Sequence, residues 1–399
     1  MAALPLEGHD DYAKVAQLVQ PVHMPRSDAP PNPMKRIDPF MFGSRYLEEG
    51  DDVFAYNAWD HVEADPEYLA YAEVQYERQR DAPVSDFDKK RFNADPVKWW
   101  NLFYKNNESN FFKNRKWLQQ EFPVLAEVTK PEAGRKVVLE VGAGAGNSAF
   151  PILANNENPL LKVHACDYSK KAVEVMRASE HYDEKFMSAD VWDVTGEGEN
   201  ALPPGLEEGS VDVVVMVFIF SALAPEEWER AVANIHRVLK PGGLVLFRDY
   251  GRGDLAQVRF KKGRWMDDNF YARGDGTRVY FFDKNQLRHI WGKWSLEHGI
   301  PEFNAAAAGD DDAAVAGEQQ REEDQQEQKT TIPVAAGFDV LNISIDRRLI
   351  VNRREKLKMY RCWMQARFVK RITGADSSSP SSLETSATAT PTSETEVPN

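Results

Sequence analysis

Three glycines at alternate positions, Gly142, Gly144 and Gly146, directly follow the apolar run "VVLEV" at 137–141. A glycine-rich turn between a strand and a helix lets the backbone approach a ligand closely, which suits a nucleotide or another adenosine cofactor. The spacing here is G-x-G-x-G. A dinucleotide site prefers G-x-G-x-x-G, with a helix facing a pyrophosphate. The glycines alone do not identify the cofactor.

Acidic residues end the strands predicted after this turn. Asp167 ends "LLKVHACD", where an acid can bind the ribose hydroxyls, and Asp190 ends the next strand, where it can take the adenine amino group. Each Asp alone is explained equally well as a helix cap. Together with Glu140 and the turn "LKPGG" at 239–243, the ordered set favours S-adenosylmethionine, which has no pyrophosphate, over a nicotinamide cofactor.

Strands and helices alternate in the section that carries these residues, which is typical of a doubly wound, mostly parallel sheet. The predicted strands are 136–141, 161–166, 185–189, 211–220 and 243–247, and the predicted helices are 147–155, 169–178 and 225–239. Two further β-like runs follow residue 332 and can close the sheet as a hairpin. We therefore predict an α/β fold with a seven-stranded Rossmann-like sheet and an N-terminal helical cap.

The composition changes along the chain and predicts its division. The predicted segments are a Pro-rich disordered arm (1–43), a cap (44–125), a core (126–302), an acidic low-complexity insert (303–331), the closing hairpin (332–372) and a Ser/Thr-rich disordered tail (373–399).

The formal net charge of −14 argues against nucleic acid as a partner, but the charge is uneven. Six basic residues face two acidic ones in 248–264, and ten face two in 346–371. Two cysteines, Cys166 and Cys362, predict a reducing compartment with neither a disulfide framework nor a metal site. With no apolar run long enough for a membrane and no targeting pattern, we expect a cytoplasmic protein, with the nucleus as the alternative.

Several stretches resemble the eukaryotic tRNA N3-methylcytidine methyltransferases, a family of class I S-adenosylmethionine-dependent enzymes. The segment "YNAWDHVE" (56–63) is similar to the fungal-like branch that acts mainly on threonine tRNA. The other stretches are "WWNLFYKNNESNFFKNRKWL" (99–118), "LEVGAGAGNSAFPIL" (139–153), "LLKVHACDYSKKAVEV" (160–175), "LKPGGLVLFRDYGRGDLAQVRFKKG" (239–263), "NFYARGDGTRVYFF" (269–282) and "DRRLIVNRREKLKMYRCWMQ" (346–365).

The resemblance implies methylation of N3 of cytidine 32 in the anticodon loop of tRNA-Thr, with tRNA-Ser as a further candidate. An aminoacyl-tRNA synthetase or another auxiliary protein is a candidate partner. The implied cofactor-binding residues are Trp100, Tyr104, Gly142, Gly144, Asp167, Asp190, Val191, Met216 and Val217. From spacing alone, the favoured explanation of Trp100 and Tyr104 is a core stripe of an amphipathic helix, and only the resemblance favours a lid over the cofactor.

The basic segments are the expected RNA-binding surface, since Lys and Arg neutralise phosphates. The candidates are Arg248, Arg252, Arg259, Lys261, Lys262, Arg273, Arg347, Arg348 and Arg353, with Tyr250, Phe260 or Tyr271 to stack an unpaired base. A solvated charged face is the plainer explanation of such runs.

The chemistry expected of the site needs no general base, and no catalytic residue is assigned. Residues 218–221, "FIFS", lack the Asn or Asp with prolines that orients an exocyclic amine, whereas cytosine N3 is already a neutral nucleophile. Two other classes stay open from the residues alone. One is a noncatalytic cofactor-binding subunit associated with tRNA, and the other is a small-molecule methyltransferase.

Overall fold

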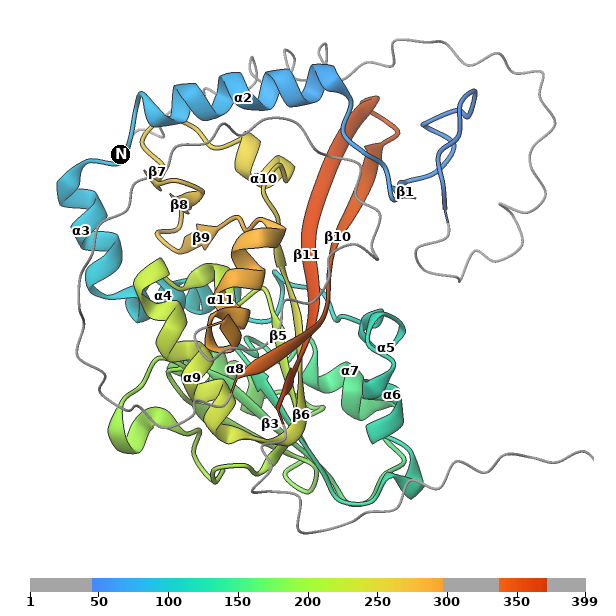
Figure 1. Ribbon diagram of the computed structural model, residues 1–399, viewed down its shortest axis with the longest axis vertical. Coiled ribbons are helices and arrows are strands. Elements are labelled where there is room, and N and C mark those ends of the chain that lie inside the picture. The colour runs from blue at the N-terminus through green and yellow to red at the C-terminus, as the bar shows by residue number, and fades with distance from the viewer. Residues whose placement is uncertain (1–44, 297–336, 372–399) are drawn as a thin grey trace, which may run out of the picture.

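The computed structural model describes residues 45–296 and 337–371. Within them, an eight-stranded sheet has the order β1-β10-β11-β6-β5-β2-β3-β4 (Figure 1). The parallel part consists of β2 (Lys136–Val141), β3 (Leu161–Asp167), β4 (Met187–Val191), β5 (Val211–Val217) and β6 (Leu239–Tyr250). The hairpin of β10 (Phe338–Asn352) and β11 (Leu357–Lys370) joins β6 antiparallel. The predicted fold class and the five predicted parallel strands are confirmed.

Helices cover both faces of the parallel strands, so these strands are apolar on both sides. On one face lie α9 (Trp228–Val238) and α11 (Lys284–Leu296). On the other lie α5 (Leu118–Glu121), α6 (Val124–Val128), α7 (Ala149–Ala154) and α8 (Lys170–Arg177). Successive residues of β2 alternate between the two cores, because Val138 packs with the second set of helices and Leu139 with the first.

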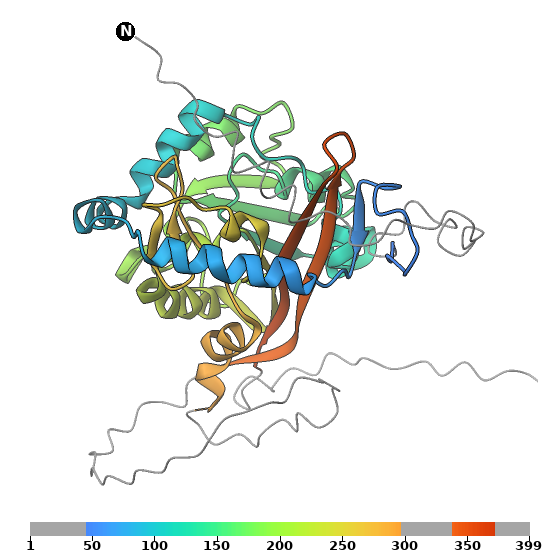
Figure 2. The same ribbon diagram turned by 90° about the horizontal axis from the view of Figure 1, so that it is seen from above.

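The cap begins with a short strand and three helices. Asp65, Ser85 and Asp95 accept backbone N–H groups at the starts of α2 (Pro66–Arg80), α3 (Asp86–Ala94) and α4 (Pro96–Asn107). Figure 2 shows α2 lying across the outside of the molecule. The strand β1 (Ala58–Asp60) pairs with β10 and is an eighth strand that the seven-stranded prediction lacks. A strand of three residues is too short to show the alternation of apolar and polar residues from which strands are predicted.

A second, three-stranded antiparallel sheet follows β6. It consists of β7 (Trp265–Asp267), β8 (Phe270–Ala272) and β9 (Arg278–Tyr280), and the short helix α10 (Leu255–Val258) precedes it. No helix in the described parts of the chain is both long and apolar enough to span a bilayer. The predicted arm (1–43), insert (303–331) and tail (373–399) lie outside the described residues.

A buried cluster of charged and polar side chains joins β6 to the hairpin. Arg248 has a side chain only 4% exposed, donates to Asp346 and Gln365, and stacks between Trp117 at 5.0 Å and Trp363 at 4.9 Å. A buried guanidinium is tolerated only when such partners replace water. The expected phosphate contact of Arg248 is therefore wrong, because its donors face the protein interior.

Arg348 belongs to the same buried cluster. It donates to Asp346 at 3.1 Å and pairs with Asp60 at 3.4 Å and Glu121 at 3.3 Å, which ties β10 to β1 and α5. Its side chain is 13% exposed, so the expected RNA contact of Arg348 is also wrong. A run of Lys and Arg in the sequence does not reveal which of their side chains face the protein interior.

Arg248→Ala is expected to lower the free energy of unfolding by about 3 kcal/mol, because Asp346 keeps only Arg348 as a cationic partner and the Trp117 and Trp363 rings lose the guanidinium between them. Urea denaturation followed by fluorescence measures the loss. Arg347→Ala is the matched control. That side chain is 42% exposed, and its removal should change stability by about 0.5 kcal/mol or less. An Arg248→Ala protein of unchanged stability with weakened tRNA binding would instead restore the phosphate role.

Candidate active site

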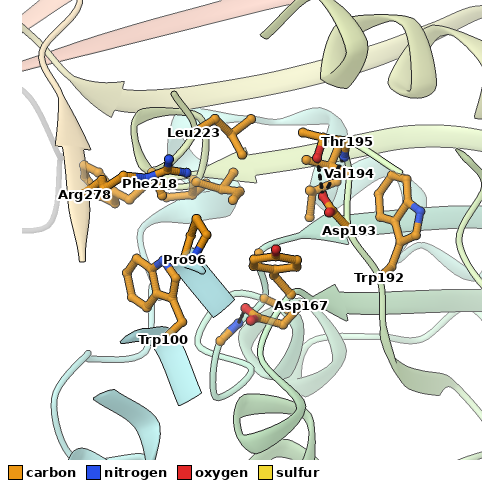
Figure 3. A pocket seen from close by; sticks show the side chains of 18 of the residues that line it. Pro96, Trp100, Asp167, Trp192, Asp193, Val194, Thr195, Phe218, Leu223 and Arg278 are labelled. Atoms are coloured by element: carbon orange, nitrogen blue, oxygen red, sulfur yellow. Dashed lines mark hydrogen bonds between the residues drawn. The ribbon is translucent and has the colours of Figure 1, made fainter. Parts of the chain in front are cut away.

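A pocket opens at the carboxyl edge of the parallel strands, where ligands bind in open α/β sheets. The loop after β2, the end of β3, the segment after β4, the end of β5 and helix α4 contribute its lining. Its empty volume is about 880 Å³, a value that includes the open mouth. Figure 3 shows Trp192 and Asp193 on one side, Arg278 and Phe218 on the other, and Asp167 below.

Glycine is required at two positions of the loop after β2. Gly142 and Gly144 have φ values of 66° and 61°, a left-handed conformation that other residues rarely adopt. A Cβ on Gly142 would lie 2.6 Å from Ile219 Cγ1, and one on Gly144 would lie 2.4 Å from the Tyr104 hydroxyl. The backbone therefore packs against the cap and the end of β5 with no room for a side chain.

Asp167 holds this loop from the end of β3. Its carboxylate accepts the Gly144 N–H at 2.8 Å and the Ser169 N–H at 2.8 Å. Burial raises the pKa of Asp167 to about 6, although the two N–H donors oppose the shift. Asp167 also lines the pocket, so the carboxylate that orders the loop is exposed to a ligand there.

A buried ion pair lies behind the loop. Arg115 of the cap lines the pocket and contacts Glu140 at 3.5 Å and Ser148 Oγ at 2.6 Å. Glu140 also accepts the Ala149 N–H at 2.9 Å, at the start of α7. Burial raises the pKa of Glu140 to about 7, and Arg115 opposes the rise. Arg115 thus brings a positive charge to the end of the pocket formed by the glycine loop.

Two aromatic residues of α4 cover the same end. Trp100 and Tyr104 stack with ring centroids 6.2 Å apart, and both line the pocket. Tyr104 also packs with Phe103 and Ala172 in a small core cluster. Trp100 and Tyr104 therefore both pack in a core cluster and cover one end of the pocket.

The structure brings six of the nine predicted cofactor residues together in the pocket lining: Trp100, Tyr104, Gly142, Gly144, Asp167 and Val217. Three lie outside it. Met216 is fully buried in the core beneath α9, Val191 is 47% exposed, and Asp190 pairs with Arg177 of α8 at 2.8 Å. Adenine binding by Asp190 stays a prediction. It requires the Asp190 carboxylate either to bind adenine and Arg177 at the same time or to break its contact with Arg177.

The remaining RNA candidates differ in exposure. Arg259, Lys261, Lys262 and Arg353 are exposed, and Arg252 is half exposed beside Glu73 at 3.7 Å. Arg347 is partly exposed, and Arg273 lies 5.5 Å from the Tyr250 ring. Tyr271 cannot stack a base as expected, because it is 2% exposed and its ring stacks on Phe260 at 4.7 Å. Their binding of RNA stays a prediction.

Several lining residues were not predicted from the sequence. Tyr168, Trp192 and Asp193 follow the ends of β3 and β4, and Arg115 and Arg278 come from the cap and from β9. Tyr168 directly follows Asp167, so its position after the end of a predicted strand could have identified it as a lining residue. The two arginines carry no local pattern, because distant segments bring them to the pocket.

The fold and this pocket define a class I S-adenosylmethionine-dependent methyltransferase. A family model described as "Methyltransferase domain" matches residues 139–245. A solved S-adenosylmethionine-dependent methyltransferase from Anabaena variabilis is 12% identical with a TM-score of 0.41, covering 73% of this chain and 97% of that one.

Curated relatives are much more similar in sequence. The tRNA(Thr) (cytosine(32)-N(3))-methyltransferase of Saccharomyces cerevisiae is 44% identical over 91% of this chain, which spans only 51% of that protein. The tRNA N(3)-methylcytidine methyltransferase trm140 of Schizosaccharomyces pombe is 44% identical over 82% of this chain and 92% of that protein. Human METTL2B is 32% identical over 84% of this chain and 95% of that protein. The chain belongs to the tRNA N3-methylcytidine methyltransferase family.

The pocket fits S-adenosylmethionine by the chemistry of its lining. The glycine loop admits a ligand close to the backbone, Asp167 offers acceptors for ribose hydroxyls, and Arg115 suits the methionine carboxylate. Trp100 and Tyr104 present aromatic faces, which attract a cation such as a sulfonium.

Gly144→Ala should weaken cofactor binding by about tenfold or more, because a Cβ both strains the left-handed backbone and displaces Tyr104. Titration calorimetry with S-adenosylhomocysteine measures it. Gly205→Ala is the matched control, since Gly205 has φ +74° with nothing within 4 Å of its added Cβ. It should lose stability and keep affinity. Equal affinities for all three proteins would contradict the assignment of this loop.

Cofactor affinity should fall by about tenfold for each pH unit below about 6, because protonated Asp167 loses acceptor capacity for the ribose hydroxyls. Above pH 6 the carboxylate predominates and this contribution is complete. Calorimetry from pH 5 to 8 tests the slope. Asp167→Asn should bind weakly and remove the part of the slope that is centred near pH 6. A slope that persists unchanged in this variant would place the titrating group elsewhere.

Proposed function

We propose that this protein transfers the methyl group of S-adenosylmethionine to N3 of cytidine 32 in the anticodon loop of tRNA-Thr. The observation that carries the proposal is one pocket that joins the glycine loop and Asp167 to the end of β5. The 44% identity to two fungal tRNA methyltransferases supports the substrate class. The preference for tRNA-Thr over tRNA-Ser rests on the Saccharomyces cerevisiae relative, half of whose length this chain spans.

The side chains around the pocket bind and orient, and they need not move a proton. When bound, S-adenosylmethionine supplies an electrophilic methyl group on a positively charged sulfur. Cytosine N3 carries a lone pair and no proton at neutral pH, so holding it in line with the methyl group can provide most of the rate. The lining holds the carboxylates of Asp167, Asp193 and Glu227, and this reaction does not require any of them to accept a proton.

The aromatic and apolar residues at the end of β5 suit a base turned out of its stack. Phe218 lies in the left-handed region with φ 60°, and its N–H donates to the Arg248 carbonyl at 2.8 Å. Tyr250 packs 4.9 Å from the Phe218 ring, and Arg273 lies over Tyr250. This chain of contacts runs from the pocket toward the basic segment after β6. We therefore place the flipped cytidine beside Phe218.

The function is tested by incubating the full chain with methyl-labelled S-adenosylmethionine and unmodified tRNA-Thr or tRNA-Ser, followed by nucleoside analysis. Labelled 3-methylcytidine is expected with the wild type, and Asp167→Ala should lower it by about 100-fold or more. The labelled nucleoside is identified by its chromatographic retention against a 3-methylcytidine standard, because cytidines methylated at N3, N4 or C5 have the same mass.

Three other outcomes separate the alternatives. Product that forms only after a cell extract is added supports a partner protein such as an aminoacyl-tRNA synthetase. Cofactor binding without product in any arm identifies a noncatalytic subunit. Label in small molecules of the extract, with none in RNA, identifies a small-molecule methyltransferase. A cytoplasmic location stays a prediction.

A further inference from the structure

Gln79 is a buried amide on the inner side of α2, where it is 2% exposed. Its side-chain NH₂ group donates to the carbonyl oxygens of Gln257 at 3.1 Å, Val258 at 3.2 Å and Phe260 at 3.1 Å. These carbonyls stand at the end of α10, a four-residue helix that cannot pair its own last C=O groups. The side-chain oxygen of Gln79 accepts the Tyr271 hydroxyl at 2.9 Å. Gln79 therefore caps α10 from a neighbouring helix (Figure 1).

The loop that follows α10, residues 259–263, is anchored at its other end as well, and we call it the basic loop. The Gly263 N–H donates to the Ala82 carbonyl at 2.7 Å, shortly after the end of α2. Between the two anchors, the Phe260 ring stacks on Tyr271 with centroids 4.7 Å apart and planes 8° apart. The basic loop therefore presents its cations from a backbone that α2 holds. The exposed side chains of the loop are Arg259, Lys261 and Lys262.

Two arginines outside the basic loop extend the same surface. Arg80, the last residue of α2, is exposed, and Arg252 is exposed on the segment before α10. Burial raises the pKa of Tyr271, the charges of Arg80 and Arg252 oppose the rise, and Asp268 adds to it. Both arginines thus lie near the ring on which Phe260 stacks. The surface combines cations from the cap and from the core.

A row of aromatic contacts connects the basic loop to the pocket. The Phe281 ring lies 6.2 Å from Phe260 and 5.5 Å from Tyr250. Tyr250 in turn lies 4.9 Å from Phe218, which lines the pocket. Closely packed rings cannot slide past one another without opening a void, so they fix the position of the segments that carry them. The basic loop is therefore held at a fixed place relative to the site of methyl transfer.

We infer that the basic loop and Arg80 form a preformed site for phosphates of the tRNA, and that Gln79 is the positioning residue that holds this site in place; the inference rests on the proposed function. Exposed Lys and Arg attract phosphates whatever the sequence, and such contacts set how an RNA lies on a protein. A loop that is already ordered loses little conformational entropy when it binds. Loss of the Gln79 amide should therefore weaken tRNA binding although it removes no charge.

The first arm of the test removes the cations of the basic loop. The variant Arg259→Ala/Lys261→Ala/Lys262→Ala is titrated with unmodified tRNA-Thr over a series of salt concentrations. The slope of log Kd against log salt should fall by about 2–3, since each phosphate contact contributes about one. These side chains are exposed, so the variant should fold and bind S-adenosylhomocysteine as the wild type does. An unchanged slope would overturn the inference whatever the other variants do.

The second arm is a double-mutant cycle on Gln79. Gln79→Met keeps the length of the side chain and removes its N–H donors. It should weaken tRNA binding about fivefold in the wild type and have no further effect in the triple variant, where the cations that it positions are gone. Titration with S-adenosylhomocysteine identifies a protein that has lost its fold. A loss of tRNA affinity that is the same in both backgrounds shows that Gln79 does not act through the loop, and this result refutes its positioning role.

Lys130→Ala/Arg135→Ala/Lys136→Ala is the matched control, because it removes the same charge from the opposite edge of the sheet. Lys136 begins β2, and the other two residues precede it, so all three lie away from the pocket at the carboxyl edge. Their loss should change the slope far less than loss of the basic loop, and equal changes would contradict a localised site. Failure of the wild type to methylate tRNA-Thr would refute the proposed function, whereas methylation with an unchanged slope in the loop variant refutes only this inference.

Discussion

The contact between Arg115 and Glu140 links the cap to the core of the methyltransferase. Glu140 has a side chain 1% exposed, and placing a carboxylate there is costly unless a cation and N–H donors replace water. Arg115 and the Ala149 N–H are those partners. Arg115 also lines the pocket. The same guanidinium that stabilises the buried Glu140 carboxylate therefore offers a positive charge to a ligand. The cap therefore supplies part of the pocket wall.

Much of the fold was predictable because its main features repeat over short distances. The apolar runs that become β2, β3 and β5 need burial on both faces, and the glycine loop needs a left-handed backbone. Asp167 followed from its place at a strand end. The strand β1 was not predictable, because its three residues pair with β10, almost three hundred residues later in the chain. Only the assembled sheet edge defines that pairing.

Charged residues were the least predictable part of the site, because the side chain alone does not say which partner it meets. Arg248 and Arg259 stand in one basic segment, yet the first is buried between two Trp rings and the second is exposed. The difference arises because Arg248 lies in β6, where the hairpin brings Asp346 against it, whereas Arg259 follows the short helix α10. Arg278 is a similar case, since β9 carries it to a pocket built mainly by other segments.

The fixed charges of the pocket suit a reaction that moves a positive charge without creating one. Before transfer the charge lies on sulfur, and afterwards it lies on the base. An unpaired cation in the pocket would oppose that movement, and Arg278 alone would be such a cation. Glu227, 2.9 Å from Arg278, cancels this opposition. Because these groups are already held in place by η5 (Pro225–Glu227), β9 and Asn93, little reorganisation is needed as the charge moves.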